Sequence, residues 1–206
     1  MARPAQADSA ATAQRIIDVA IPLFARDGYL GAATREIAAA AGLNVANISH
    51  YFGGKRGLYE ASVDTVYKRL GDRAAAAMAG MVLVDLDEVM SRLYAVARAE
   101  RDGVRLLVRE ILDNGHLTLH TTTKHFLPEI ENATRMTAAL LGVPTEQART
   151  AAVTIGYLMS RFVIQDDRSL VSAFGVRSAK EAHARVVATL ANTGRALFAA
   201  PAREKE

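Results

Sequence analysis

A short run of side chains between residues 45 and 50 has the sizes and hydrogen-bonding groups that can read base edges in DNA. The run consists of Val45, Ala46, Asn47, Ser49 and His50. An asparagine amide can pair with adenine, a serine hydroxyl can donate or accept, and small apolar side chains can contact a thymine methyl. Tyr51 and Lys55 follow, where a hydroxyl and an ammonium group could contact phosphates. The pattern favours a surface that binds double-stranded DNA.

Two short helices joined by a tight turn would hold this run on one surface. We expect the first over residues 34–41, with Thr34 as its N-cap and Gly42 as its stop, and the second over 45–52, with Asn44 as its N-cap. The expected core side chains are Ile37, Ala41, Leu43, Ile48 and Phe52. Together these features predict a helix-turn-helix, whose second helix enters the major groove. On spacing alone, the alternative is two helices of an ordinary bundle.

The rest of the chain also has the apolar spacing of helices, and strand patterns are nearly absent, which predicts an all-α protein. Further helices are expected over 11–27, 55–79, 87–100, 103–116, 123–141, 146–165 and 179–198, about nine helices in all. Residues 1–10 are expected to form a disordered arm and 201–206 a charged tail. The longest connection, 166–178, is expected to be a loop.

The composition limits the class of protein. Of the 206 residues, 50% are hydrophobic, so there is ample material for a core. The net charge of +3, from 25 basic and 22 acidic side chains, permits a nucleic-acid partner without requiring one. The absence of cysteine excludes disulfide and thiolate chemistry. No apolar run approaches the roughly 18 residues of a membrane span, and residues 1–13 lack a signal-peptide core. We therefore expect a cytoplasmic protein without a membrane partner.

Other groupings of reactive side chains carry less weight. His116 and His120 are four residues apart, with His125 nearby, and such spacing can chelate zinc. However, Asp113-Asn114-Gly115 indicates a helix end there, so we expect no metal and no cofactor, and a pair that lines a pocket or faces solvent. Arginines at 101, 105 and 109 favour a solvated helix flank, with anion recognition as the alternative. No triad or carboxylate pair stands out, so we do not expect an enzyme.

The stretch from Phe24 to Tyr59 resembles the TetR family of regulators. It contains, in the family's order and spacing, Phe-Ala-Arg-Asp-Gly-Tyr, Thr-Arg-Glu-Ile-Ala, Ala-Gly-Leu-Asn and His-Tyr-Phe-Gly-Gly-Lys. The segment Asn44-Val45-Ala46-Asn47-Ile48 is similar to a branch whose C-terminal domain is of the CecR-like type. Ser49 departs from the family, which usually has tyrosine at that position, so operator preference cannot be carried over from other members.

The resemblance implies a homodimer with an N-terminal DNA-binding domain and a variable ligand domain. We expect residues 11–57 to form the first and 58–200 to form the larger ligand-binding and dimerisation domain. Carried over by position, the DNA contacts are Thr34, Arg35, Asn44, Val45, Ala46, Asn47, Ser49, His50, Tyr51 and Lys55. The expected function is repression at a palindromic operator, relieved by a small-molecule inducer. The alternative is a helical small-molecule-binding or scaffold protein without DNA binding.

The larger domain offers candidates for the effector site and the dimer interface. The expected effector-lining residues are Tyr94, Leu107, Ile111, His116, His120, Phe126, Tyr157, Met159, Arg161 and Phe162, although aromatic and methionine side chains at helical spacing are also typical of plain core. Small residues at 148, 152, 156 and 160 would let another helix approach closely. The expected dimer interface is Ala148, Ala152, Gly156 and Ser160 with Val186, Leu190, Thr193 and Leu197. The alternative is that this ridge packs within one subunit.

Overall fold

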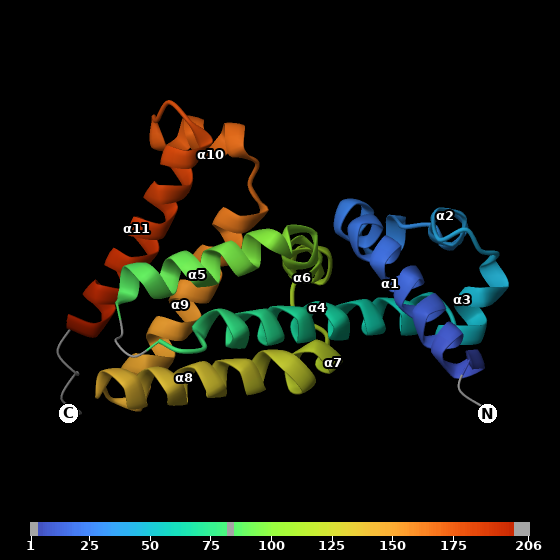
Figure 1. The fold of residues 1–206 in the computed structure, drawn as a ribbon, viewed down its shortest axis with the longest axis horizontal. Helices are drawn as coiled ribbons and strands as arrows, with labels where there is room; N and C mark the ends of the chain where they lie inside the picture. The colour runs from blue at the N-terminus through green and yellow to red at the C-terminus, as the bar shows by residue number, and fades with distance from the viewer. Residues whose placement is uncertain (1–3, 82–84, 200–206) are drawn as a thin grey trace. The chain divides into compact units, whose positions relative to one another are not determined.

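The computed structural model describes residues 4–81 and 85–199, and every regular element in these ranges is a helix (Figure 1). In chain order they are α1 (Pro4–Gly31), α2 (Thr34–Ala40), α3 (Val45–Phe52), α4 (Lys55–Met78), α5 (Leu86–Ala99), α6 (Arg101–Asn114), α7 (Leu119–Thr121), the π-helix η1 (Thr122–Phe126), α8 (Leu127–Leu141), α9 (Thr145–Ile164), α10 (Asp167–Phe174) and α11 (Ala179–Ala199). The all-α prediction is confirmed. None of the described helices combines the length and apolarity that a membrane span needs.

The described chain forms two compact units. The first comprises the residues up to Arg69 together with Asp102–Thr122, and the second comprises Leu70–Arg101 together with the residues from Thr123 onward. This division differs from the expected boundary after residue 57, because α6 packs on α4: a Cβ on Gly103 would lie 2.9 Å from the methyl groups of Val66. The assignment of 11–57 to DNA and of 58–200 to ligand and dimer contacts stays a prediction.

The core of the first unit joins the first four helices. Phe24 of α1, Ile37 of α2, Ile48 of α3 and Leu58 of α4 are each at most 1% exposed. The ring of Phe24 also meets the ring of Tyr59 edge to face, with centroids 5.1 Å apart. Such burial of large apolar side chains is the main source of folding free energy. The short helices α2 and α3 are therefore fixed by side chains that reach into a shared core.

Helix α1 begins at Pro4, so the expected disordered arm is wrong for residues 4–10. Proline is well tolerated in the first turn of a helix, and the following segment is rich in alanine, the strongest helix former. The expected end of this helix at residue 27 agrees with the break at Gly28, which has φ 74° and ψ 176°, although a further turn extends α1 to Gly31. Residues 1–3 of the expected arm and the expected tail lie outside the described residues.

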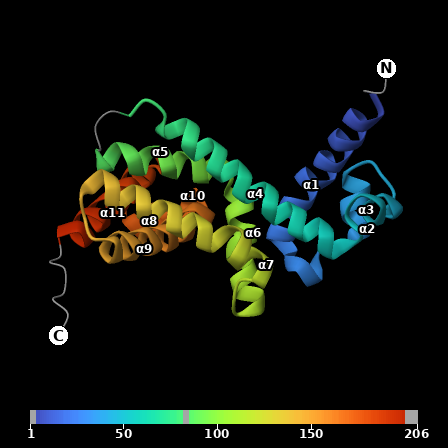
Figure 2. The same ribbon diagram turned by 90° about the horizontal axis from the view of Figure 1, so that it is seen from below.

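The second unit is built from longer helices. Helix α8 packs beside α9, both α9 and α5 pack on α11, and α10 also packs on α11 (Figures 1 and 2). The expectation of a loop over 166–178 is wrong, because α10 lies within it. Asp166 caps α10 by accepting the Ser169 N–H at 2.8 Å, and the fully buried Leu170 anchors it.

Candidate DNA-binding site

The turn between α2 and α3 is closed by two backbone hydrogen bonds. The Gly42 N–H donates to the Ala39 carbonyl and the Leu43 N–H to the Ala38 carbonyl, both at 2.9 Å. This is the Schellman arrangement, which requires the left-handed conformation that Gly42 adopts with φ 68°. The expected N-cap at Thr34 is wrong: α2 starts at Thr34, and the cap residue is Ala33, which has no side-chain acceptor.

Helix α3 is short and capped at both ends. The predicted cap by Asn44 is confirmed, because its side-chain oxygen accepts the Asn47 N–H at 3.2 Å. At the other end, Gly53 takes φ 70° and its N–H donates to the Ser49 carbonyl at 2.9 Å. Ile48, at 1% exposure, holds the inner face of α3 to the core. The helix therefore has one fixed inner face and one outer face.

The outer face of α3 carries the side chains that the sequence assigned to base reading. Val45, Ala46, Ser49 and His50 are exposed. Asn47 is half-buried, and its amide donates to the side-chain oxygen of Asn44 at 2.9 Å and to the Asn44 carbonyl at 3.3 Å. The structure thus places Val45, Ala46, Ser49 and His50 on the exposed face of α3, whereas the expected outer position of Asn47 is only partly accessible. That these residues contact DNA stays a prediction.

The remaining predicted DNA contacts flank α3. Thr34 and Tyr51 are half-buried and Arg35 is exposed. Lys55 donates to the Leu30 carbonyl at 3.2 Å, and its ammonium lies 5.0 Å from the centre of the Tyr29 ring. Lys55 therefore joins the start of α4 to the end of α1, a contact that sequence reasoning missed, because the partner is a backbone oxygen.

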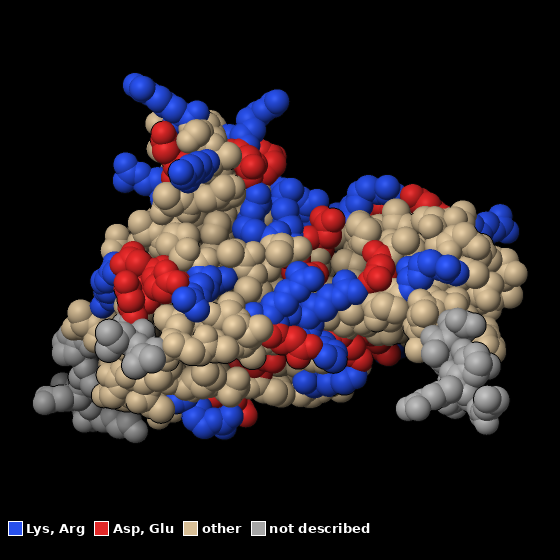
Figure 3. All heavy atoms as spheres, viewed as in Figure 1, with Lys and Arg blue, Asp and Glu red and all other residues tan. Residues whose placement is uncertain are grey.

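Arg26, at the end of α1 near this site, is paired with two carboxylates. Arg26 contacts Asp27 at 2.6 Å and Glu36 of α2 at 2.8 Å. The hydrogen bond from Arg26 lowers the pKa of Asp27 below its ordinary value. On the molecular face in Figure 3, acidic and basic side chains are interspersed.

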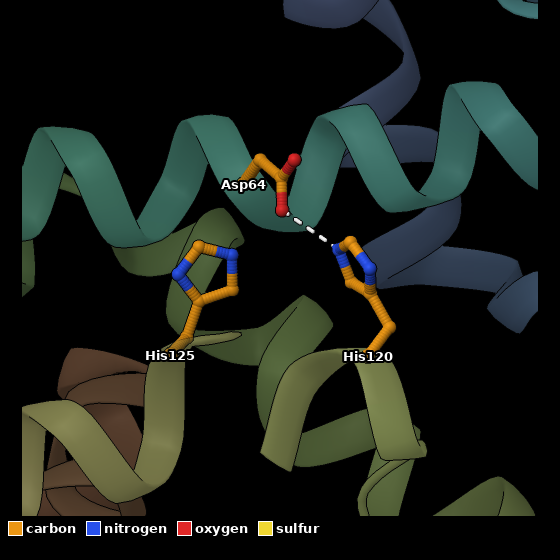
Figure 4. Close-up of side chains that lie close together, drawn as sticks. All are labelled: Asp64, His120 and His125. Carbon is orange, nitrogen blue, oxygen red and sulfur yellow. Dashed lines mark hydrogen bonds and ion pairs between the residues drawn. The ribbon is translucent and has the colours of Figure 1, made fainter. Parts of the chain in front are cut away.

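His116 and His120 lie in different segments, because the helix end indicated by Asp113-Asn114-Gly115 falls before both of them. Helix α6 ends at Asn114, Gly115 takes φ 74°, and His116 is exposed beyond it. His120 lies in α7, where its Nε2 is 2.8 Å from the Oδ1 of Asp64 in α4 (Figure 4). The partner of His120 is thus a carboxylate from a distant segment, which spacing alone does not reveal.

Two of the three spaced arginines are not a solvated flank. Arg101 donates to the Ile164 carbonyl at 2.8 Å, and Arg109 donates to the Arg26 carbonyl at 3.0 Å. Arg105 lies 3.9 Å from Asp102 on its own helix. The carbonyls that Arg101 and Arg109 hold lie near helix ends, where backbone oxygens lack partners within the helix.

Among the expected effector-lining residues, only Tyr94 borders the groove of about 500 Å³ between α5 and α11. The Tyr94 hydroxyl lies 2.9 Å from Nδ1 of His183, whose Nε2 is 3.3 Å from Asp167. Burial raises the pKa of Tyr94. Sequence reasoning missed His183, because no local motif links it to Tyr94.

The other expected lining residues are divided between the units. Leu107, Ile111, His116 and His120 belong to the first unit, and Phe126, Tyr157, Met159, Arg161 and Phe162 belong to the second. Tyr157 is 53% exposed and Arg161 is also exposed, so neither faces the interior of its own unit.

The expected dimer residues divide into buried and accessible groups. Ala148, Val186 and Leu190 are fully buried within one protomer, where α9 packs on α11, so they offer no surface to a second copy. Ala152, Ser160, Thr193 and Leu197 are half-buried, and Gly156 is exposed. A Cβ on Gly156 would meet no atom within 4 Å. The row of small residues on α9 therefore packs partly within the subunit, which was the alternative to a dimer interface.

Known proteins share this architecture. The family model for bacterial regulatory proteins of the tetR family matches residues 16–62. The probable HTH-type transcriptional regulator YttP of Bacillus subtilis (strain 168) is 30% identical over 122 residues, which are 57% of this chain and 59% of YttP. The HTH-type transcriptional dual regulator CecR of Shigella flexneri is 33% identical over 95 residues, 46% of this chain and 38% of CecR. The chain thus spans less than two thirds of either relative.

A solved structure shows the same fold over nearly the whole chain. The TetR-like transcriptional regulator from Rhodococcus sp. RHA1 superposes with a TM-score of 0.63 at 18% identity, covering 90% of this chain and 96% of that one. The match includes the larger helical part, which the family model does not cover.

Proposed function

The chain belongs to the TetR family of bacterial regulatory proteins, and from this membership we propose that it regulates transcription by binding operator DNA through α3. A regulator of this kind acts where the bacterial chromosome lies, in the cytoplasm. The names of both curated relatives describe transcriptional regulators, which supports a regulatory and not a catalytic role for this chain. Most family members are repressors, so repression is the proposed direction.

The single observation that carries the proposal is the construction of α3. Its inner face is anchored by Ile48 at 1% exposure, its start is capped by Asn44, and its outer face presents Ser49 and His50 to solvent. A recognition helix needs this combination, because its base-reading side chains must be free while its backbone is held still.

DNA binding is tested by mobility shift against a pool of random-sequence duplexes at several salt concentrations. A DNA-binding protein should show affinity that falls linearly with log salt, because bound phosphates release counterions. His50→Ala supplies a matched variant whose fold should be intact, because His50 is exposed. Wild-type protein that shifts no duplex at low salt would overturn the proposal and favour a helical binding protein without DNA affinity.

We propose that the protein works as a homodimer on a palindromic operator. The accessible parts of α9 and α11 support this assembly, since Gly156 and Tyr157 are exposed on α9. A two-fold dimer would present two copies of α3, which fit half-sites about one helical turn apart or a multiple of it. Selection of bound sequences tests this: an enriched site without two-fold symmetry contradicts it.

The effector is proposed to be a small molecule held by the larger domain. Helix α4 begins three residues after α3 ends and continues past Arg69 into the second unit, so it is a continuous element through which a ligand could affect α3. An inducer must bind the DNA-incompetent state more tightly, and bound operator must weaken the inducer by the same factor. Isothermal titration of a candidate with and without operator tests that compound, and equal affinities exclude it as inducer.

A further inference from the structure

The end of α1 meets α6 at a glycine. Gly28 is buried and combines φ 74° with ψ 176°, a backbone region that is essentially restricted to glycine. A Cβ at Gly28 would lie 2.3 Å from Oδ2 of Asp113 and 2.9 Å from Nε of Arg109. Side chains of α6 therefore occupy the space that a larger residue at position 28 would fill. We call Gly28, Arg109 and Asp113 the α1–α6 clasp.

Arg109 makes the hydrogen bonds of the clasp. Its Nη1 donates to the Arg26 carbonyl at 3.0 Å, and its Nε donates to Asp113 at 3.2 Å. The Arg26 carbonyl lies just before Gly28 breaks the regular helix, a place where carbonyls need partners from outside. A cation near a helix C-terminus is also favoured by the helix dipole. Helix α6 thus supplies a cap for α1.

The residue held by the clasp is connected to the helix-turn-helix. Arg26, whose carbonyl Arg109 holds, also forms the ion pair with Glu36 at 2.8 Å. Glu36 lies in the first turn of α2, directly before the fully buried Ile37. The end of α1 is therefore fixed on one side by α6 and on the other by α2.

We propose that Arg109 and Asp113 are positioning residues for DNA reading, although both lie far from α3 in the sequence. By holding the end of α1, they set the direction in which the chain enters α2, and hence how α3 is presented. The proposal rests on the proposed function, because its main readout is DNA affinity. Neither residue needs to touch DNA.

A matched pair of variants tests this role. Arg109→Ala removes the cap, and Arg105→Ala removes the same charge one turn earlier on α6, where the side chain is 39% exposed against 38% for Arg109. The probe is a duplex recovered from a random pool by the wild-type protein. We expect Arg109→Ala to weaken binding about tenfold, which corresponds to one lost charge-assisted hydrogen bond. Arg105→Ala should weaken it less than about twofold. Equal losses would overturn the proposal.

Two further readouts separate positioning from phosphate contact and from general instability. The salt slope should be the same in Arg109→Ala and wild type, because a lost phosphate contact would lower it by about one. Amide exchange at Ala32, whose N–H donates to the Gly28 carbonyl at 3.1 Å, should speed up in Arg109→Ala only. Arg109→Lys should restore part of the affinity. A slope lowered by one, or no rescue, contradicts the proposal.

The outcomes also separate this proposal from the proposed function. If the wild-type protein retains no duplex, the proposed function is contradicted. Amide exchange at Ala32 in the DNA-free protein still tests whether the clasp holds the end of α1. Unchanged exchange at Ala32 in Arg109→Ala then overturns the proposed clasp.

If Arg109→Ala does not fold, Asp113→Asn removes one acceptor of the clasp at nearly constant size. It should weaken DNA binding in the same direction and leave the salt slope unchanged, and wild-type affinity would count against the role of Asp113.

Discussion

The side-chain oxygen of Asn44 accepts both hydrogen-bond donors of Asn47, the backbone N–H at 3.2 Å and the side-chain amide at 2.9 Å. Asn44 therefore stabilises the start of α3 and also holds the amide of a predicted base-reading residue. To bind a base with this amide, Asn47 must leave Asn44, whereas the backbone bond of the cap can remain. The two asparagines are consequently expected to differ in what their loss affects.

Asn44→Ala should lower the free energy of unfolding by about 1 kcal/mol, the usual loss when a capping side chain is removed. Asn47→Ala should lower it by less than about 0.5 kcal/mol, because the capped N–H is retained and surface changes have small effects. Urea denaturation of both variants measures the difference. The cap assignment is contradicted if Asn47→Ala is the more destabilising of the two.

Asp166→Ala should destabilise the second unit by about 1 kcal/mol through the loss of the α10 cap. Leu170→Ala should cost more, about 2–5 kcal/mol, because Leu170 is fully buried and its truncation leaves a cavity. Ser172→Ala is a suitable control, since Ser172 is exposed on the same helix. Thermal unfolding followed by circular dichroism should give the order Leu170, Asp166, Ser172, and a different order would argue against α10 as a packed helix.

The ion pair of Asp27 should make stability depend on pH in the acid range. Its pKa in the folded protein is lowered, so its contribution is present above the unfolded value of about 3.9 and is lost as pH falls through the folded value. The stability gap between wild type and Asp27→Asn should therefore be widest near pH 6 and should close on acidification. A gap that is constant between about pH 6 and pH 2 contradicts this account.

Gly156→Leu should leave the protomer folded, because no atom lies within 4 Å of a Cβ at that position. If the exposed face of α9 forms the dimer, the larger side chain should keep two copies apart. Sedimentation should then show monomers, and a palindromic duplex should be bound weakly. Ala196→Leu, at an exposed position on α11, tests the neighbouring helix in the same way. An intact dimer in both variants would place the interface elsewhere.

The helix-turn-helix was predictable from the sequence because its signals are local. Gly42 and Asn44 mark a turn and a cap within a few residues of one another, and Ile37 and Ile48 mark the buried faces. Thr34 was misassigned as a cap, because a threonine at the first helical position gives the same pattern as one at the cap.

The remaining features depend on contacts between distant segments. Helix α10 is short, and its anchor Leu170 is buried by tertiary packing that local propensity cannot indicate. The Tyr94–His183 and Arg109–Arg26 contacts join different helices without any local motif. The role of the small residues of α9 could not be predicted for another reason, because the same spacing suits helix packing within a subunit and between two subunits. The burial of Ala148 shows that part of this row of small residues packs within the subunit.

The central claim, that the outer face of α3 reads bases, is tested most directly by selecting sequences from a random duplex pool with wild type, Ser49→Ala and His50→Ala. All three proteins should fold alike, since both side chains are exposed. The wild type should enrich a defined site, and each variant should lose preference at one position per half-site, with discrimination lowered by about 1–3 kcal/mol. A wild-type protein that enriches no sequence, or variants that enrich the same site with the same preference, would contradict the account.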